Sequence, residues 1–143
     1  MVAARLSLVT LGVSDVERAT NFYLALGFER SSASVDGEVS FFRMAGSVLA
    51  VYGREDLAAD AGLVADGSGF RGVSLSMNFD TAADVDRAFQ AWAAAGASVV
   101  RSAAPTAWGG YVGYVSDLDG HLWELAHNPS FPFTPDGRVD LPA

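Results

Sequence analysis

The sequence predicts an α+β protein built from two tandem βαβββ modules, and two observations predict this fold class. First, two helix-like stretches of similar sequence, SDVERATNFYLALGF and ADVDRAFQAWAAAGA, place Asp15 and Asp84 at equivalent positions. The shift between them is 69 residues, about half of the 143-residue chain. Second, a strand-like run precedes each helix and three short β-rich runs follow it.

The strand before each helix is predicted at residues 6–13 in the first half and 73–79 in the second. In the second run, hydrophobic residues alternate with the small polar residues Ser74, Ser76 and Asn78. Because successive side chains of a strand point to opposite faces, one face is predicted to pack under a helix and the other to be polar.

The two helices are predicted from an acidic or hydroxyl start, apolar positions three and four apart, and a glycine stop at Gly27 and at Gly96. Tyr23 and Trp92 lie on the apolar faces of these helices. We therefore expect both aromatic residues to pack in the core rather than to contact a ligand.

Turn dipeptides such as Asp-Gly separate the β-rich runs that complete each half. These runs are predicted at 28–35, 38–45, 47–53, 97–103, 110–116 and 121–127. The predicted organisation is a single domain, 1–143, with a first module at 5–53, an acidic glycine-rich linker at 54–71, a second module at 72–128 and a proline-rich tail at 129–143.

The composition excludes several classes of partner. The formal net charge is −8, and the basic residues are scattered singly, so we expect neither nucleic acid nor a membrane surface as a partner. Cysteine is absent, which excludes disulfides and thiolate metal sites. No run of about 18 apolar residues and no signal sequence is present, so a cytoplasmic protein is expected.

The motif HLWELAH raises the question whether His121, Glu124 and His127 hold a metal. In a strand, Glu124 points away from both histidines, and the histidines lie about 20 Å apart along the chain. Metal ligands must lie within about 2.2 Å of the ion, so a strand cannot form this site within one chain. A helix would let the three residues partly converge, but the preceding Asp-Gly turn and the repeat favour a strand.

Several motifs together resemble the glyoxalase, bleomycin-resistance and extradiol-dioxygenase superfamily, also called vicinal oxygen chelate proteins. These motifs are VTLGVSD, the FY and LGF of the first helix, WGGY, and DLDGHLWEL followed by NP. The likeness covers roughly Leu6 to Pro132. It implies that the modules form a curved mixed-sheet cup, often completed in a homodimer, and that metal-using members take two ligands from each module.

Carried onto this sequence, the family's four ligand positions fall at Leu8, Ala50, about Ser74, and Glu124. Glu124 matches the family glutamate, whereas leucine and alanine cannot coordinate a metal. One carboxylate with serine neighbours is a poor site for zinc, nickel or iron. We therefore expect no cofactor, unless residues elsewhere supply ligands for a divalent metal.

Strand parity, together with the resemblance, predicts a small-molecule pocket with an apolar and aromatic lining and a few polar groups. The alternative is that the same residues fill a packed interior. The predicted ligand-binding residues are Leu8, Thr10, Ala50, Tyr52, Ser74, Ser76, Asn78, Trp108, Tyr114, Leu122 and Glu124.

The leading hypothesis is a homodimeric binding protein that sequesters a small aromatic or amphipathic molecule, such as a drug or metabolite. The alternative is a glyoxalase-like lyase, isomerase or dioxygenase-type enzyme that uses Glu124 with or without a divalent metal. A third alternative is a scaffold without a ligand. Glu124 could anchor the ligand, act as the catalytic acid or base, or be a remnant bonded to Ser74 or Ser76.

Overall fold

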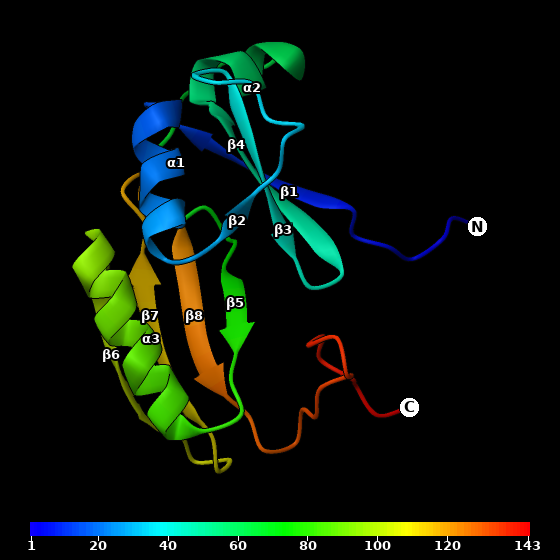
Figure 1. Cartoon of the computed structure of the whole chain (residues 1–143), viewed down its shortest axis with the longest axis vertical. Coiled ribbons are helices and arrows are strands. Elements are labelled where there is room, and N and C mark those ends of the chain that lie inside the picture. Colours follow the sequence, from blue (N-terminus) through cyan, green and yellow to red (C-terminus); the bar gives the residue numbers. More distant parts are fainter. The chain divides into compact units, whose positions relative to one another are not determined.

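The computed structural model describes residues 1–143, and the chain divides into two compact units, Met1–Ser68 (unit 1) and Gly69–Ala143 (unit 2). Each unit contains one βαβββ module with a mixed four-stranded sheet (Figure 1). The predicted fold class is therefore confirmed. No helix of the chain combines the length and the apolar character that crossing a membrane requires.

The sheet of unit 1 has the strand order β1-β4-β3-β2, in which β1 and β4 are parallel and the other pairs antiparallel. Two parallel neighbouring strands need a crossover connection, and the helix that follows β1 begins the connection from β1 to β4. The elements are β1 (Leu8–Val13), α1 (Val16–Ala25), β2 (Glu29–Arg30), β3 (Val39–Met44) and β4 (Ser47–Gly53).

Aromatic packing between α1 and the sheet forms the core of unit 1. Tyr23 and Phe42 are both fully buried, with ring centroids 5.8 Å apart, and Phe28 stacks on Tyr23 at 5.4 Å. The helix begins after Asp15, whose side chain accepts a hydrogen bond from the Arg18 backbone N–H at 3.0 Å. The prediction that Tyr23 is a core residue is confirmed.

Two segments of unit 1 differ from the sequence predictions. The run predicted at 28–35 forms only the two-residue β2, because the following chain turns back on itself through hydrogen bonds between Val35 and Val39. The segment treated as a linker begins with helix α2 (Arg54–Asp60). Its residues Arg, Glu, Leu and Ala favour helices, and its acidic first turn complements the helix dipole.

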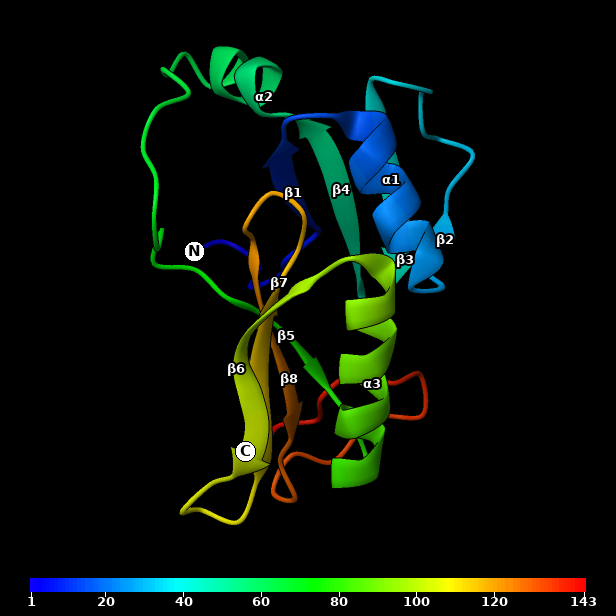
Figure 2. The ribbon, with the colours of Figure 1, turned by 90° about the vertical axis from the view of Figure 1, so that its left-hand side faces the viewer.

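The sheet of unit 2 repeats this topology with the order β5-β8-β7-β6, in which the neighbouring strands β5 and β8 are parallel. Figure 2 shows the helix of this unit running alongside the sheet. The strands begin or end within about two residues of the predicted bounds. The elements are β5 (Leu75–Asn78), α3 (Ala82–Ala95), β6 (Ser98–Pro105), β7 (Tyr111–Ser116) and β8 (Leu122–His127).

Two tryptophans form the centre of the core in unit 2. Trp92 of α3 and Trp123 of β8 are buried, and their ring centroids lie 5.3 Å apart. The helix begins after Thr81, which caps the backbone N–H of Asp84, and ends at Gly96 in the left-handed conformation with φ 108°. Because Trp123 faces α3, the alternation of β8 directs Glu124 to the opposite face of the sheet.

Candidate functional site

We call the face of each sheet opposite its βαβββ helix the inner face, and a polar cluster lies at the centre of the inner face of unit 2. The strand pairing aligns Ser76 of β5 with Glu124 of β8, and Glu124 with Tyr114 of β7. The Ser76 hydroxyl donates to Glu124 Oε1 at 3.1 Å, and the Tyr114 hydroxyl donates to Oε2 at 2.8 Å. Three neighbouring strands thus each contribute one residue to the cluster.

The hydrogen bonds fix the chemical character of this cluster. Each carboxylate oxygen of Glu124 accepts one bond and keeps capacity for another, so the group can also accept a bond from a ligand. The hydrogen bond to Glu124, together with burial and the negative charge of Glu124, raises the pKa of Tyr114, while the charge of Arg101 opposes this rise. Tyr114 is therefore a neutral donor at physiological pH.

A hollow of about 400 Å³ adjoins the cluster within unit 2. Its lining combines one carboxylate, one guanidinium, an indole, a phenol and small apolar side chains, which is typical of small-molecule pockets. The lining residues are Arg101, Ala104, Pro105, Thr106, Ala107, Trp108, Val112, Tyr114 and Glu124.

The loop between β6 and β7 places Trp108 at this hollow. Thr106 closes the loop by bonding to Gly110, whose backbone N–H donates to Thr106 Oγ1 at 2.9 Å. A Cβ atom at Gly110 would lie 2.1 Å from the Trp108 ring, so the ring lies against the glycine. Glycine at 110 therefore allows the half-exposed indole of Trp108 to occupy this position.

Arg101 lines the hollow, and sequence reasoning missed it. It aligns with Tyr114 in the sheet, but β6 has irregularities on both sides of it, between Val99 and Arg101 and between Arg101 and Ala104. Such bulges break the alternation of faces, so strand parity could not assign its side chain. A lone arginine in a predicted strand was the available signal. It forms no ion pair within the chain.

The structure brings four of the predicted site residues together at this place: Trp108, Tyr114 and Glu124 line the hollow, and Ser76 bonds to Glu124. The other predicted residues of unit 2 are not among those that line the hollow. Ser74 precedes β5, Leu122 at the start of β8 aligns with Ser116, and Asn78 lines a separate hollow of about 480 Å³.

The four predicted residues of unit 1 lie on the sheet of that unit. Thr10 and Ala50 are aligned, whereas Leu8 aligns with Val48. Tyr52 follows on β4, and the negative charge of Asp60 in α2 is the main cause that raises the pKa of Tyr52. The role of Leu8, Thr10, Ala50 and Tyr52 in ligand binding stays a prediction.

The strand register shows which residues lie beside Ala50 and Glu124, two of the positions that correspond to the family's metal ligands. The residue aligned with Ala50 is Thr10 rather than Leu8, and the residue aligned with Glu124 is Ser76 rather than Ser74. These four positions therefore offer the hydroxyls of Thr10 and Ser76, the methyl group of Ala50 and the carboxylate of Glu124. Zinc, nickel and iron prefer several imidazole or carboxylate donors, which this set does not supply. No three His, Cys, Asp or Glu residues are close enough to share a metal.

The two histidines of HLWELAH do not join Glu124. His127 Nδ1 lies 3.0 Å from the carbonyl oxygen of Phe79, so this nitrogen donates to the backbone. His121 lies just before β8, in a turn where its backbone N–H donates to Asp117 Oδ1 at 2.9 Å. The interpretation of this motif as a strand is confirmed.

Comparisons with known proteins agree with this architecture. The family model described as the Glyoxalase/Bleomycin resistance protein/Dioxygenase superfamily matches residues 5–125. A crystal structure of a glyoxalase-related enzyme from Fulvimarina pelagi is 32% identical and has a TM-score of 0.87, covering 99% of this chain and 100% of that one.

Two further structures show the fold alone. A glyoxalase/bleomycin resistance protein/dioxygenase family enzyme from Burkholderia phytofirmans is 20% identical with a TM-score of 0.76, covering 87% of this chain and 98% of that one. Lactoylglutathione lyase from Agrobacterium tumefaciens is 20% identical with a TM-score of 0.67, covering 88% and 95%. No functionally curated protein matches the chain.

Proposed function

The chain belongs to the glyoxalase/bleomycin resistance protein/dioxygenase superfamily, and we propose that it binds a small amphipathic aromatic molecule and leaves it chemically unchanged. The observation that carries this proposal is the oriented Glu124 carboxylate beside an aromatic-lined hollow of about 400 Å³. That volume lies in the range of small-molecule pockets.

The lining supports one orientation of the ligand. The exposed indole of Trp108 offers a flat surface on which an aromatic ring stacks. Glu124 offers the remaining acceptor capacity of its two oxygens to an ammonium, amide or hydroxyl group. The ligand is therefore an aromatic ring that carries a hydrogen-bond donor.

Binding is favoured over acid–base catalysis by the state of the two titratable groups. Both oxygens of Glu124 already accept hydrogen bonds from neutral donors, which orients the carboxylate as an acceptor. Tyr114 holds its proton because its pKa is raised, so it is a donor rather than a base near neutral pH. The positions that correspond to the family's metal ligands add no second carboxylate or imidazole.

The experiment uses phenethylamine, 3-phenylpropionate and benzyl alcohol, which share a phenyl ring and differ in their polar group. Trp108 is the exposed tryptophan of the three, so its fluorescence reports binding, and Trp108→Phe serves as the control. Phenethylamine is expected to bind more tightly than benzyl alcohol because its ammonium group pairs with Glu124, and 3-phenylpropionate reports on Arg101 of the same lining. Glu124→Gln should weaken the binding of phenethylamine by about tenfold to a hundredfold, since hydrogen bonds to charged groups contribute about 1.5–3 kcal/mol. Equal binding by the variant would contradict the proposal.

A second candidate is an enzyme in which Glu124 is the acid or base, and the observation behind it is that a second titratable group, the Tyr114 hydroxyl, lies 2.8 Å from Glu124 Oε2. A proton-transfer pair of this kind is a common element of active sites. The two candidates separate when proton NMR follows the bound compound with time. An enzyme gives a product that Glu124→Gln abolishes while binding survives, whereas a binding protein returns the compound unchanged.

The proposal includes the homodimer that the family resemblance implies. Light scattering is expected to give a mass of about 30 kDa, twice the 15.0 kDa of one chain. A mass of one chain at the concentration of the binding measurements would show that the monomer binds alone.

A further inference from the structure

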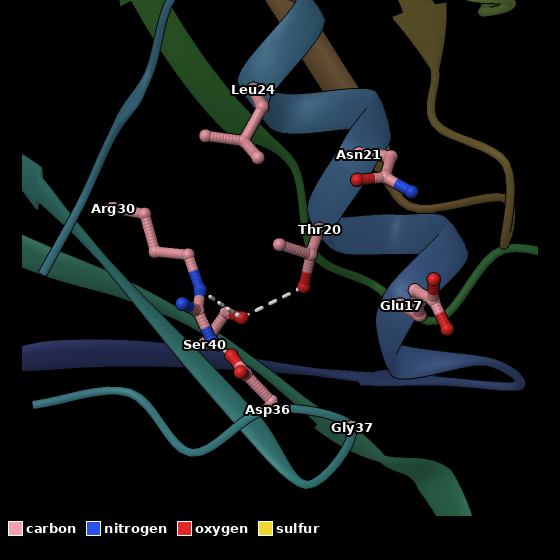
Figure 3. A pocket seen from close by; sticks show the side chains of 8 residues that line it. All are labelled: Glu17, Thr20, Asn21, Leu24, Arg30, Asp36, Gly37 and Ser40. Carbon is pink, nitrogen blue, oxygen red and sulfur yellow. Dashed lines mark hydrogen bonds and ion pairs between the residues drawn. The ribbon is translucent and has the colours of Figure 1, made fainter. Parts of the chain in front are cut away.

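A hollow of about 360 Å³ lies in unit 1 on the side of the sheet that carries α1 (Figure 3). It is bounded by α1, by the start of β3 and by the turn that precedes β3. Arg30 and Asp36 lie on one side of it, and Asn21 and Leu24 of the helix lie on the other. This hollow is separate from the inner face on which the proposed function rests.

A chain of buried hydroxyl groups fixes the arginine of this hollow. Arg30 Nε donates to Ser40 Oγ at 3.0 Å, and Ser40 Oγ lies 2.8 Å from Thr20 Oγ1. The Thr20 hydroxyl donates to the carbonyl oxygen of Val16 at 2.6 Å, so Ser40 must donate to Thr20 and accept from Arg30. Ser40 and Thr20 are both buried, which gives the guanidinium a fixed orientation.

Most of the hydrogen-bonding capacity of Arg30 remains open to a ligand. A guanidinium has five N–H donors; Nε uses one on Ser40, and Nη2 uses one on Asp36 at 2.8 Å. The Asp36 side chain is 96% exposed, and exposed ion pairs contribute little to stability. A ligand carboxylate can therefore replace Asp36 on Arg30 at small cost.

The opposite wall has the complementary polarity. Glu17 forms no ion pair within the chain, and Asn21 follows it by one helical turn on α1. Leu24 adds an apolar surface beside them. A simple anion would meet Glu17 and Asp36, and a simple cation would meet Arg30, whereas a zwitterion places each charge opposite its complement.

We propose that this hollow binds a small aliphatic amino acid. Its carboxylate takes the place of the Asp36 carboxylate on Arg30, its ammonium group faces Glu17 and Asn21, and its side chain contacts Leu24. The geometry of the guanidinium suits a carboxylate because the two groups form parallel hydrogen bonds.

The test is an NMR titration of the ¹⁵N-labelled full chain with L-leucine. Two analogues serve as probes of the charges: 4-methylpentanoate lacks the ammonium group, and 3-methylbutylamine lacks the carboxylate. Leucine is expected to shift the amide signals of Thr20, Arg30 and Ser40, and each analogue is expected to bind several-fold more weakly. The absence of shifts at these residues with leucine would overturn the proposal. Equal affinity for 4-methylpentanoate would show that the ammonium group does not contribute, which would overturn the preference for a zwitterion.

Two pairs of variants separate the proposed contacts from general effects of charge. Arg30→Gln should abolish the leucine shifts, whereas Arg43→Gln should keep them, because Arg43 pairs with Glu29 away from this hollow. Asp36→Asn should tighten binding roughly twofold to fivefold, the factor expected when an exposed ion pair is released. Glu38→Gln removes a charge from the same turn and should change affinity less. Equal tightening by both substitutions, or none by Asp36→Asn, would overturn the exchange of carboxylates.

Discussion

The inner faces of the two units have the same strand geometry and different chemistry. In unit 2 the register aligns Ser76, Glu124 and Tyr114 across β5, β8 and β7. In unit 1 the same arrangement of β1, β4 and β3 aligns Thr10, Ala50 and Phe41. The fold thus brings three side chains together in each unit, and the identity of the residues alone decides whether they form a polar cluster.

The strand that follows the helix differs as well, and this difference accounts for the place of the 400 Å³ hollow in unit 2 and of the 360 Å³ hollow in unit 1. In unit 2 this strand is β6, with eight residues, and its hairpin with β7 carries Arg101 and Trp108 to the inner face. In unit 1 it is β2, with two residues, and the chain then turns so that Asp36 meets Arg30 beside α1. One topology therefore supports hollows on opposite sides of its sheet.

The largest expected effect tests whether the helix-facing cores of the two units are equivalent. Phe42→Ala in unit 1 and Trp123→Ala in unit 2 should each lower the free energy of unfolding by about 3–5 kcal/mol, because both side chains are buried. Urea unfolding followed by circular dichroism measures this. Trp108→Ala is the control and should change stability by less than about 0.5 kcal/mol. A large loss for only one of the two core variants would show that the cores differ.

A graft of the polar cluster onto unit 1 tests the comparison directly. Ala50 is the counterpart of Glu124 but is only 1% exposed, so Ala50→Glu should destabilise the protein by about 2–4 kcal/mol. Adding Phe41→Tyr supplies a donor at the position that corresponds to Tyr114 and should restore about 1 kcal/mol of this loss. The four proteins form a double-mutant cycle in urea unfolding. A coupling energy of zero would mean that unit 1 cannot form the cluster.

Two glycines on the sheets give the next smaller effect. A Cβ at Gly113 would lie 2.5 Å from the Phe89 ring and 2.7 Å from the backbone nitrogen of Ala103, so Gly113→Ala should destabilise the protein by about 1–3 kcal/mol. In unit 1, a Cβ at Gly12 would lie 3.2 Å from Arg54 Cα, a milder contact. Gly12→Ala should therefore cost less in the same unfolding measurement. The reverse order would show that β6 yields more easily than α2.

The sequence predicts the fold well because the fold depends on patterns that repeat. The 69-residue shift, the alternation before the second helix and the capped amphipathic helices are local features, and each half supports the interpretation of the other. The two errors have local causes. The run 28–35 keeps only two strand residues because the Ser34 backbone N–H donates to the Ser31 carbonyl oxygen at 3.1 Å, which closes a turn within the run. The helix α2 was hidden because its own acidic residues and the glycines that follow it together gave the segment 54–71 the composition of a linker.

The site is less predictable because it depends on the register between distant strands. Parity alone places Ser74 and Ser76 on one face, and only the pairing with β8 selects Ser76 as the partner of Glu124. The bulges of β6 hide Arg101 from any argument based on alternation. Trp108 lies in a loop, where strand parity does not apply, so its place at the hollow follows from the close approach to Gly110.

The smallest expected effect is a change in the pKa of two tyrosines, one in each unit, whose pKa values are raised by different causes. The pKa of Tyr114 is raised above its ordinary value of about 10 mainly by the hydrogen bond to Glu124, and that of Tyr52 mainly by the negative charge of Asp60. Glu124→Gln should lower the first pKa and Asp60→Asn the second. NMR of ¹³C-labelled tyrosine measures both titrations in one sample.

Salt separates the two causes further. At about 1 M salt, where the Debye length is about 3 Å, the charge of Asp60 is screened, so the pKa of Tyr52 should fall toward its ordinary value. A hydrogen bond is short and is screened much less, so the pKa of Tyr114 should stay raised. Because both folded-state values lie above the unfolded value, the stability they contribute is present below pH about 10 and is lost as the pH rises through the folded-state pKa. Equal salt sensitivity of Tyr52 and Tyr114 would mean that the charge of Glu124, rather than its hydrogen bond, raises the pKa of Tyr114.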